Sequence, residues 1–169
     1  MIWYALLVGA VAFERLFEVR VAERNRAVST SHGGVEFGAG HYPAMVALHF
    51  SLLVGCLVEP VVLHRHFIPT LGWSMFVVVL AAQALRWWCI TTLDYQWNTR
   101  VIVIPGAARI TGGPYRLIPH PNYVAVIAEG AALPLVHTGW VTALVFSMLN
   151  GWLLSKRIRV ENAALASLS

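Results

Sequence analysis

Two short polar segments in the second half of the chain carry the residues whose types and spacing could support chemistry. The first holds Tyr115, His120 and Tyr123 within nine residues. Proline on both sides of His120, at Pro119 and Pro121, restricts the backbone and so pre-positions the imidazole ring. Aromatic faces attract cations, so this segment could hold a positively charged small molecule. The plainer alternative is that the prolines only end a loop before a helix.

The second segment holds Arg157 and Glu161, which are four residues apart and therefore share one face of a helix. An arginine can bind an anionic oxygen, bidentately if the oxygen belongs to a carboxylate. Glu161 can hold Arg157 in place or accept a proton. The alternative is a solvated ion pair, which contributes only about 0.2–0.5 kcal/mol and is weaker with Arg before Glu. We therefore predict an active-site role for both residues.

The elements that must position these residues are predicted to be membrane helices. Hydrophobic residues make up 58% of the 169 residues and charged residues only 12%, against about 25% charged in soluble domains. A transmembrane helix needs roughly 20 mainly apolar residues, and five stretches approach this length. We expect an all-α, polytopic membrane fold in a single domain, residues 1–169, with about five transmembrane or membrane-embedded helices. The stretches are 2 to about 22, 43–63, 69–93, 122–137 and 139–155, the last two forming a hairpin.

The polar segment 94–121 interrupts this pattern, and residues 101–104 in it are predicted to form a short strand followed by a turn. Arginine and lysine gather in the first and third loops and after the last stretch. The positive-inside rule then predicts the N-terminus outside, with the two chemical segments and the C-terminus cytoplasmic. The net charge of +4 is assigned to loops that face an anionic leaflet, because no dense basic run indicates nucleic-acid binding.

The two chemical segments together resemble the isoprenylcysteine carboxyl methyltransferase family. They read Gly113-Pro-Tyr-Arg-Leu-Ile-Pro-His-Pro-Asn-Tyr123 and Arg157-Ile-Arg-Val-Glu-Asn-Ala-Ala-Leu165. The resemblance covers about residues 97–165. It implies an integral enzyme of the bacterial cytoplasmic membrane that uses S-adenosylmethionine to methylate an oxygen of a lipophilic acceptor. By the same resemblance, the cofactor-binding residues are Tyr115, His120, Pro121 and Tyr123, and the catalytic residues are Arg157 and Glu161.

This sequence departs from the family pattern at two positions. The arginine that precedes His-Pro in the family is Pro119 here, and the second acidic residue of the later motif is Asn162. If the missing arginine held the carboxylate of the cofactor, Arg116 would have to replace it. Asn162 can still hydrogen-bond a ribose hydroxyl or a substrate oxygen.

Two classes of methyl acceptor remain open. The family name implies the carboxylate of a prenylated cysteine, which Arg157 alone could orient. Residues 33–43 look like a short bacterial branch associated with type III polyketide synthases, which implies a hydroxyl of an alkylresorcinol or alkylpyrone. A phenol has a pKa near 10 and needs a base, such as Glu161 or His41. We favour the hydroxyl because of this first-loop segment.

A different class of protein, a haem-binding electron carrier, would require facing histidines, and His49 with His137 is the one plausible pair. No metal site is expected, since Cys56 and Cys89 lie in apolar runs without CxxC spacing. The sequence does not predict an oligomeric state.

Several charged or polar residues have both a functional and a structural interpretation. Glu129 is either functional, as carboxylates at membrane depth usually are, or paired with Arg86 or Arg116. A cluster of Glu14, Arg15 and Glu18 is expected to neutralise itself at the cytoplasmic interface. Glu36 and His41 could assist an acceptor hydroxyl or simply cap the first loop.

Overall fold

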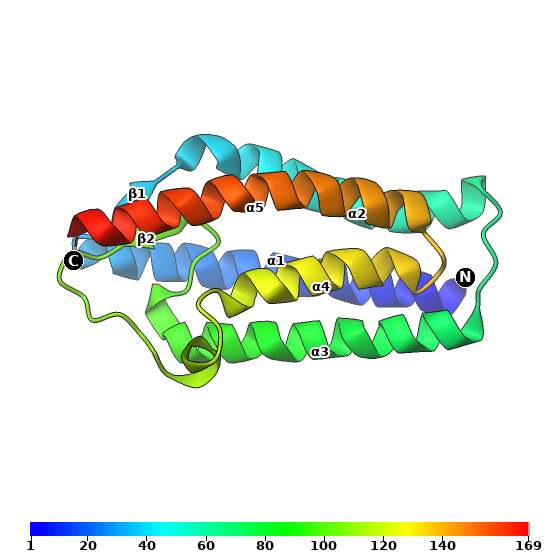
Figure 1. Cartoon of the computed structure of the whole chain (residues 1–169), viewed down its shortest axis with the longest axis horizontal. Coiled ribbons are helices and arrows are strands. Elements are labelled where there is room, and N and C mark those ends of the chain that lie inside the picture. Colours follow the sequence, from blue (N-terminus) through cyan, green and yellow to red (C-terminus); the bar gives the residue numbers. More distant parts are fainter. Residues whose placement is uncertain (169) are drawn as a thin grey trace.

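The computed structural model describes residues 1–168, which form a bundle of five α-helices (Figure 1). The helices run alternately up and down the bundle, and short 3-10 turns lie at Ala39–His41, Asp94–Gln96 and Gly113–Arg116. The predicted all-α architecture is confirmed. The helices are α1 (Ile2–Ser31), α2 (Tyr42–Val62), α3 (Pro69–Leu93), α4 (Pro121–Leu135) and α5 (Trp140–Leu168).

Prolines mark where three of the helices begin. Pro69 and Pro121 are the first residues of α3 and α4, and Pro43 is the second residue of α2. Proline suits these positions because it lacks an N–H that a first turn would leave unpaired, and its fixed φ is helical. The predicted starts of these helices therefore agree with the structure to within one residue.

Two helices extend well beyond their predicted apolar stretches, namely α1 to Ser31 and α5 to Leu168. The added part of α1 is polar but has tertiary partners: Asn25 Nδ2 donates to the backbone oxygens of Asp94 and Trp97, both at 2.9 Å. Ser29 Oγ donates to the oxygen of Tyr95 at 3.0 Å. The hydropathy pattern predicts too short a helix because it carries no information on these tertiary contacts.

Within the described residues, two segments are long and apolar enough to cross a membrane, Ala39–Val62 and Pro69–Gln96, which contain α2 and α3. Helix α4 has only 15 residues, or about 22 Å at 1.5 Å per residue, against a hydrocarbon core of about 30 Å. It runs antiparallel to α5 after a turn at residues 136–139 (Figure 1). Length and composition thus support two spanning helices, with α4 and α5 as the predicted hairpin.

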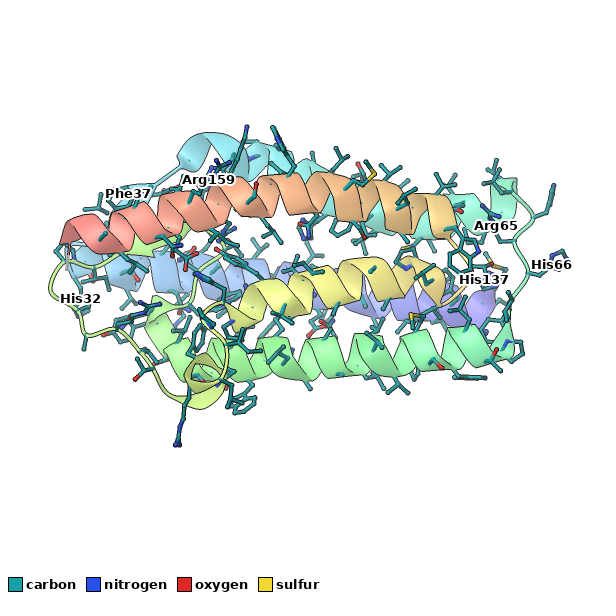
Figure 2. The ribbon with its side chains drawn as sticks, viewed as in Figure 1. His32, Phe37, Arg65, His66, His137 and Arg159 are labelled. Atoms are coloured by element: carbon teal, nitrogen blue, oxygen red, sulfur yellow. The ribbon has the colours of Figure 1, made fainter. Side chains whose placement is uncertain are left out.

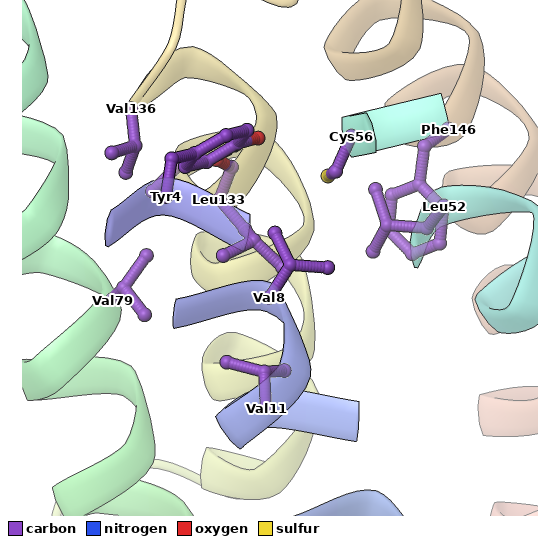
Figure 3. Packing of buried hydrophobic residues seen from close by; sticks show 10 residues of the cluster. Tyr4, Val8, Val11, Leu52, Cys56, Val79, Leu133, Val136 and Phe146 are labelled. Atoms are coloured by element: carbon purple, nitrogen blue, oxygen red, sulfur yellow. Dashed lines mark hydrogen bonds between the residues drawn. The ribbon is translucent and has the colours of Figure 1, made fainter. Parts of the chain in front are cut away.

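The hydrophobic core lies toward the end of the bundle that holds the N-terminus, and it joins all five helices (Figure 3). Tyr4 is fully buried, and its hydroxyl donates to the backbone oxygen of Leu133 at 3.0 Å. This bond satisfies a polar atom that would otherwise be costly to bury. Val8, Leu133 and Val136 pack around it. The core therefore holds α1 against α4 at the end opposite the two chemical segments.

A buried network of charges links α1, α3 and α4 near the middle of the bundle. Arg15 pairs with both Glu18 and Glu129, and Arg86 pairs with Glu129 and, at 3.6 Å, with Glu18. Glu14 accepts hydrogen bonds from Gln83 and Trp87. The predicted pairing inside the cluster is confirmed for Arg15 and Glu18, but the cluster does not neutralise itself alone, because residues of α3 and α4 also pair with it. Arg86, the first of the two suggested partners of Glu129, does pair with it.

The predicted strand is present as β2 (Val101–Val103), and its partner is β1 (Val35–Phe37) from the first loop. The two strands are antiparallel, with Val35 opposite Val103 and Phe37 opposite Val101. This two-stranded sheet ties the first loop to the third loop beside the C-terminal part of α5 (Figure 1). The two loops and the C-terminal helix therefore meet at one end of the bundle.

Candidate active site

A cavity of about 510 Å³ opens at the end of the bundle that holds β1, β2 and the C-terminal part of α5. Its volume is in the range of small-molecule sites, roughly 300–1,000 Å³. The polar residues that line it come from the third loop, the first turn of α4 and the C-terminal part of α5, together with Ser29 of α1. They are Ser29, Gln96, Trp97, Asn98, Arg100, Arg109, Tyr115, His120, Asn122, Tyr123, Arg157, Glu161 and Asn162.

Tyr123 joins the two residues predicted to be catalytic. Its hydroxyl donates a hydrogen bond to Glu161 Oε2 and accepts one from Arg157 Nε at 2.9 Å. Arg157 and Glu161 do share a face of α5, as their spacing predicts. In the described part of the chain, however, the tyrosine hydroxyl connects them in place of a direct ion pair. Arg157 is only 7% exposed, so Arg157 and Glu161 do not form the solvated ion pair that was the alternative.

His120 lies beside this group at the start of α4. Its ring stacks on Tyr123, with centroids 5.4 Å apart and planes at 21°, and its Nδ1 is 3.5 Å from Glu161 Oε1. The residue before a proline is restricted to extended conformations, so Pro121 keeps His120 out of the helix. Pro121 itself is fully buried and is not among the residues that line the cavity.

Tyr115 enters the cavity from the 3-10 turn at Gly113–Arg116. Burial, together with the neighbouring Cys89 thiol, raises the pKa of the Tyr115 hydroxyl above its ordinary value. The hydroxyl therefore stays protonated at neutral pH and can act as a neutral hydrogen-bond donor.

Three residues that line the cavity each hold a buried polar atom without a hydrogen-bond partner in the described chain: Trp97 Nε1, Arg100 Nε and Asn122 Oδ1. Buried polar atoms are nearly always satisfied, so two donors and an acceptor left free around one cavity indicate a polar ligand. S-adenosylmethionine fits this set, since it carries a carboxylate, an amino group and an adenine. Asn122 stands inside the His-Pro motif and could have been found from it, whereas nothing in the local sequence distinguishes Arg100.

Other residues with predicted roles lie elsewhere or have other partners. Arg116, the suggested replacement for the missing family arginine, is exposed and is not among the lining residues. Glu36 forms ion pairs with Arg100 at 2.7 Å and with Arg26 at 3.5 Å. These pairs connect the first loop to the third loop and to α1. Asn162 lines the cavity, as a ligand-binding residue would.

His41 is not among the residues that line the main cavity. It lines a small hollow that also includes Tyr42, Met45 and Arg157. Gly38, with a φ of +64°, makes the turn that leads to it, and a Cβ there would lie 2.3 Å from His41 Cε1. A side chain at this position would therefore displace the His41 ring.

The two histidines considered for haem binding have separate surroundings. His49 Nδ1 bonds to the backbone oxygen of Met45 at 2.8 Å, and its ring contacts Phe146. His137 lies in the turn between α4 and α5 and contacts Tyr4 and Phe67 (Figure 2). They share no ring or hydrogen-bond partner within the described residues, so they do not form a common site.

The described residues form a helical bundle with two helices long and apolar enough to span a membrane and with a polar cavity at one bundle end. Residues 74–167 match the isoprenylcysteine carboxyl methyltransferase (ICMT) family, and the chain belongs to this family. It is therefore a membrane methyltransferase. It is also 35% identical over 170 residues to a protein of Bacillus subtilis (strain 168) described as "Uncharacterized protein YpbQ". This match covers 100% of the chain and 99% of its relative.

Proposed function

We propose that the protein is an S-adenosylmethionine-dependent O-methyltransferase of a lipophilic acceptor, with the cofactor bound in the cavity at the end of the bundle. When bound, the cofactor supplies the methyl group as an electrophile on its sulfonium sulfur. The rings of Tyr115, His120 and Tyr123 offer faces for this cation. Pro121 contributes by fixing where α4 begins and thus where His120 stands.

The observation that carries this proposal is the hydrogen-bonded chain from Arg157 through Tyr123 to Glu161. It places a cation and a carboxylate side by side on the wall of one cavity. Arg157 can orient an acceptor oxygen and stabilise its negative charge. Glu161 can receive the proton of an acceptor hydroxyl, while the Tyr123 hydroxyl keeps both side chains in position. Such alignment and charge stabilisation account for a large part of a methyl-transfer barrier.

The favoured acceptor is a hydroxyl of an alkylresorcinol or alkylpyrone. A phenol needs a base near neutral pH, since its pKa is near 10, and Glu161 offers one. The ionised carboxylate of a prenylated cysteine would instead meet the like charge of Glu161. It is the second candidate, supported by the family name and by the ability of Arg157 to bind a carboxylate.

The acceptor would enter sideways from the bilayer, and the cofactor would enter from the cytosol. In this arrangement the N-terminus is outside, and the cavity and the C-terminus are cytoplasmic. The gathering of both loops at one end of the bundle supports it. The whole chain, residues 1–169, would act as one domain.

A direct test is methyl transfer from radiolabelled S-adenosylmethionine by the full-length protein in lipid nanodiscs. The acceptors are an alkylresorcinol and a farnesylated N-acetylcysteine, with resorcinol lacking the alkyl chain as the control for lipophilicity. We expect label in the alkylresorcinol and little in the other two compounds. Labelling of the farnesylated compound alone would establish the second candidate. Transfer to neither lipophilic compound by folded protein would contradict both acceptor assignments.

A further inference from the structure

Three arginines of the described chain line the cavity, and they differ in what else they contact. Arg157 is engaged by Tyr123 and by Met45, whose Sδ lies 3.1 Å from Arg157 Nη1. Arg109 is exposed. Arg100 is largely buried, and its Nε has neither a protein partner nor contact with solvent.

Arg100 is held rigidly on its other sides. Its Nη1 donates to Glu36 Oε1 at 2.7 Å, and its guanidinium carbon lies 4.1 Å from the centre of the Tyr42 ring. The bond to Glu36 also raises the pKa of Arg100, so the side chain is always charged. A charged group already fixed in place loses little conformational entropy when it binds a ligand.

Trp97, three residues earlier, has the same unusual feature. Its side chain lines the cavity, the residue is 2% exposed, and its indole N–H has no acceptor. The backbone around both residues is anchored: Asn98 Nδ2 donates to the oxygen of Ala22 at 3.0 Å, and Asn98 Oδ1 accepts from the N–H of Arg100 at 3.1 Å. One short segment thus presents two N–H donors without acceptors.

We propose that Trp97 and Arg100 form the subsite that binds the α-carboxylate of S-adenosylmethionine. This inference rests on the proposed function. A carboxylate is the only anionic group of the cofactor, and its two oxygens can accept from both the guanidinium and the indole. The subsite takes the place of the arginine that the family carries where this chain has Pro119. Arg116, the nearer arginine in sequence, is not among the residues that line the cavity.

The test is isothermal titration calorimetry with two ligands, S-adenosylhomocysteine and its decarboxylated analogue, on the full-length protein in detergent. Arg100→Met should weaken S-adenosylhomocysteine binding about tenfold or more, the scale of a lost hydrogen bond to a charged group. It should leave binding of the analogue unchanged. Trp97→Phe, which replaces the bicyclic indole and its N–H by a smaller aromatic ring without a donor, should weaken S-adenosylhomocysteine binding severalfold with the same selectivity.

Two control variants separate this role from a structural one. Arg116→Met removes an arginine of the same loop that does not line the cavity, and it should leave both affinities unchanged. Glu36→Gln removes the charged partner of Arg100 but keeps the arginine, so it should have a much smaller effect than Arg100→Met.

Equal losses for both ligands in Arg100→Met and Trp97→Phe, or no loss in either variant, would overturn the subsite. In that case, binding of S-adenosylhomocysteine by the unmodified protein would still support the proposed function. Failure of the unmodified protein to bind either ligand would overturn both.

Discussion

The Nε of Arg157 donates a hydrogen bond to the hydroxyl of Tyr123 across 2.9 Å, which connects the last helix to the first turn of α4. The two residues are 34 positions apart in the chain, and each belongs to a different sequence motif. The same hydroxyl donates to Glu161. Arg157, Tyr123 and Glu161 therefore form one hydrogen-bonded group that joins α4 to α5.

We expect Arg157→Ala to lower turnover about 10²-fold or more, the scale of losing one preorganised charge-stabilising group. Affinity for S-adenosylhomocysteine should change little, because Arg157 is expected to act on the acceptor. Arg157→Lys should restore little activity, since an ammonium cannot reproduce the planar fork of a guanidinium. Steady-state kinetics and calorimetry on the same preparations would measure both effects. Near-normal turnover in folded Arg157→Ala protein would remove Arg157 from the catalytic group.

The pH dependence of Glu161→Gln should distinguish the two acceptor classes. With a phenolic acceptor and Glu161 as the base, the variant should lose most activity at neutral pH and recover some above about pH 9, where the phenol begins to ionise by itself. With a carboxylate acceptor, the loss should be nearly independent of pH because the acceptor is already ionised. Turnover from pH 6 to 10 would decide between them, and unchanged activity at every pH would contradict a role for Glu161.

Substitution of His120 should weaken binding of the cofactor product. His120→Ala removes the ring that stacks on Tyr123 and approaches Glu161. We expect a loss of at least about 1 kcal/mol, the scale of one hydrogen bond, in calorimetry with S-adenosylhomocysteine. His64→Ala, at an exposed histidine just after the end of α2 that does not line the cavity, is the matched control. Equal affinity in the two variants would move the cofactor site away from His120.

The charge network around Glu129 should stabilise the protein as long as each of its charges keeps a partner. Glu129→Leu removes the carboxylate between Arg15 and Arg86 and leaves a buried and a partly buried cation undercompensated, so it should destabilise the protein by about 3–5 kcal/mol. Glu23→Leu, which removes an exposed partner of Arg26, should cost about 1 kcal/mol or less. Thermal unfolding in detergent would compare them. Equal melting temperatures would show that the network contributes nothing measurable.

The proposed orientation can be tested by labelling single cysteines in a background without Cys56 and Cys89. Both His66 and Arg109 are exposed. His66 lies in the connection between α2 and α3 (Figure 2), and Arg109 lines the cavity at the other end of the bundle. The positive-inside rule leads us to expect that a membrane-impermeant maleimide labels His66→Cys in intact cells. Arg109→Cys should react only after the cells are opened. The reverse pattern would place the cavity outside.

The sequence by itself indicated the family and most of the predicted site residues that line the cavity. Apolar stretches of limited length predict helices, and prolines mark their starts, because both effects are local. The spacing of Arg157 and Glu161 predicts a shared helical face for the same reason. Tyr115, His120 and Tyr123 stand close together in the chain, so their convergence on one cavity required no knowledge of the fold.

Only the tertiary structure decided which distant residues complete these groups. The partner strand of β2, the pairing of Arg15 with Glu129, and the tyrosine hydroxyl between Arg157 and Glu161 all join segments that are far apart in the chain. Local periodicity carries no information on such contacts, which depend on how the helices pack. Arg100 illustrates the limit: the sequence shows an ordinary loop arginine, and only the fold reveals that this residue lines the cavity and holds a buried donor without an acceptor.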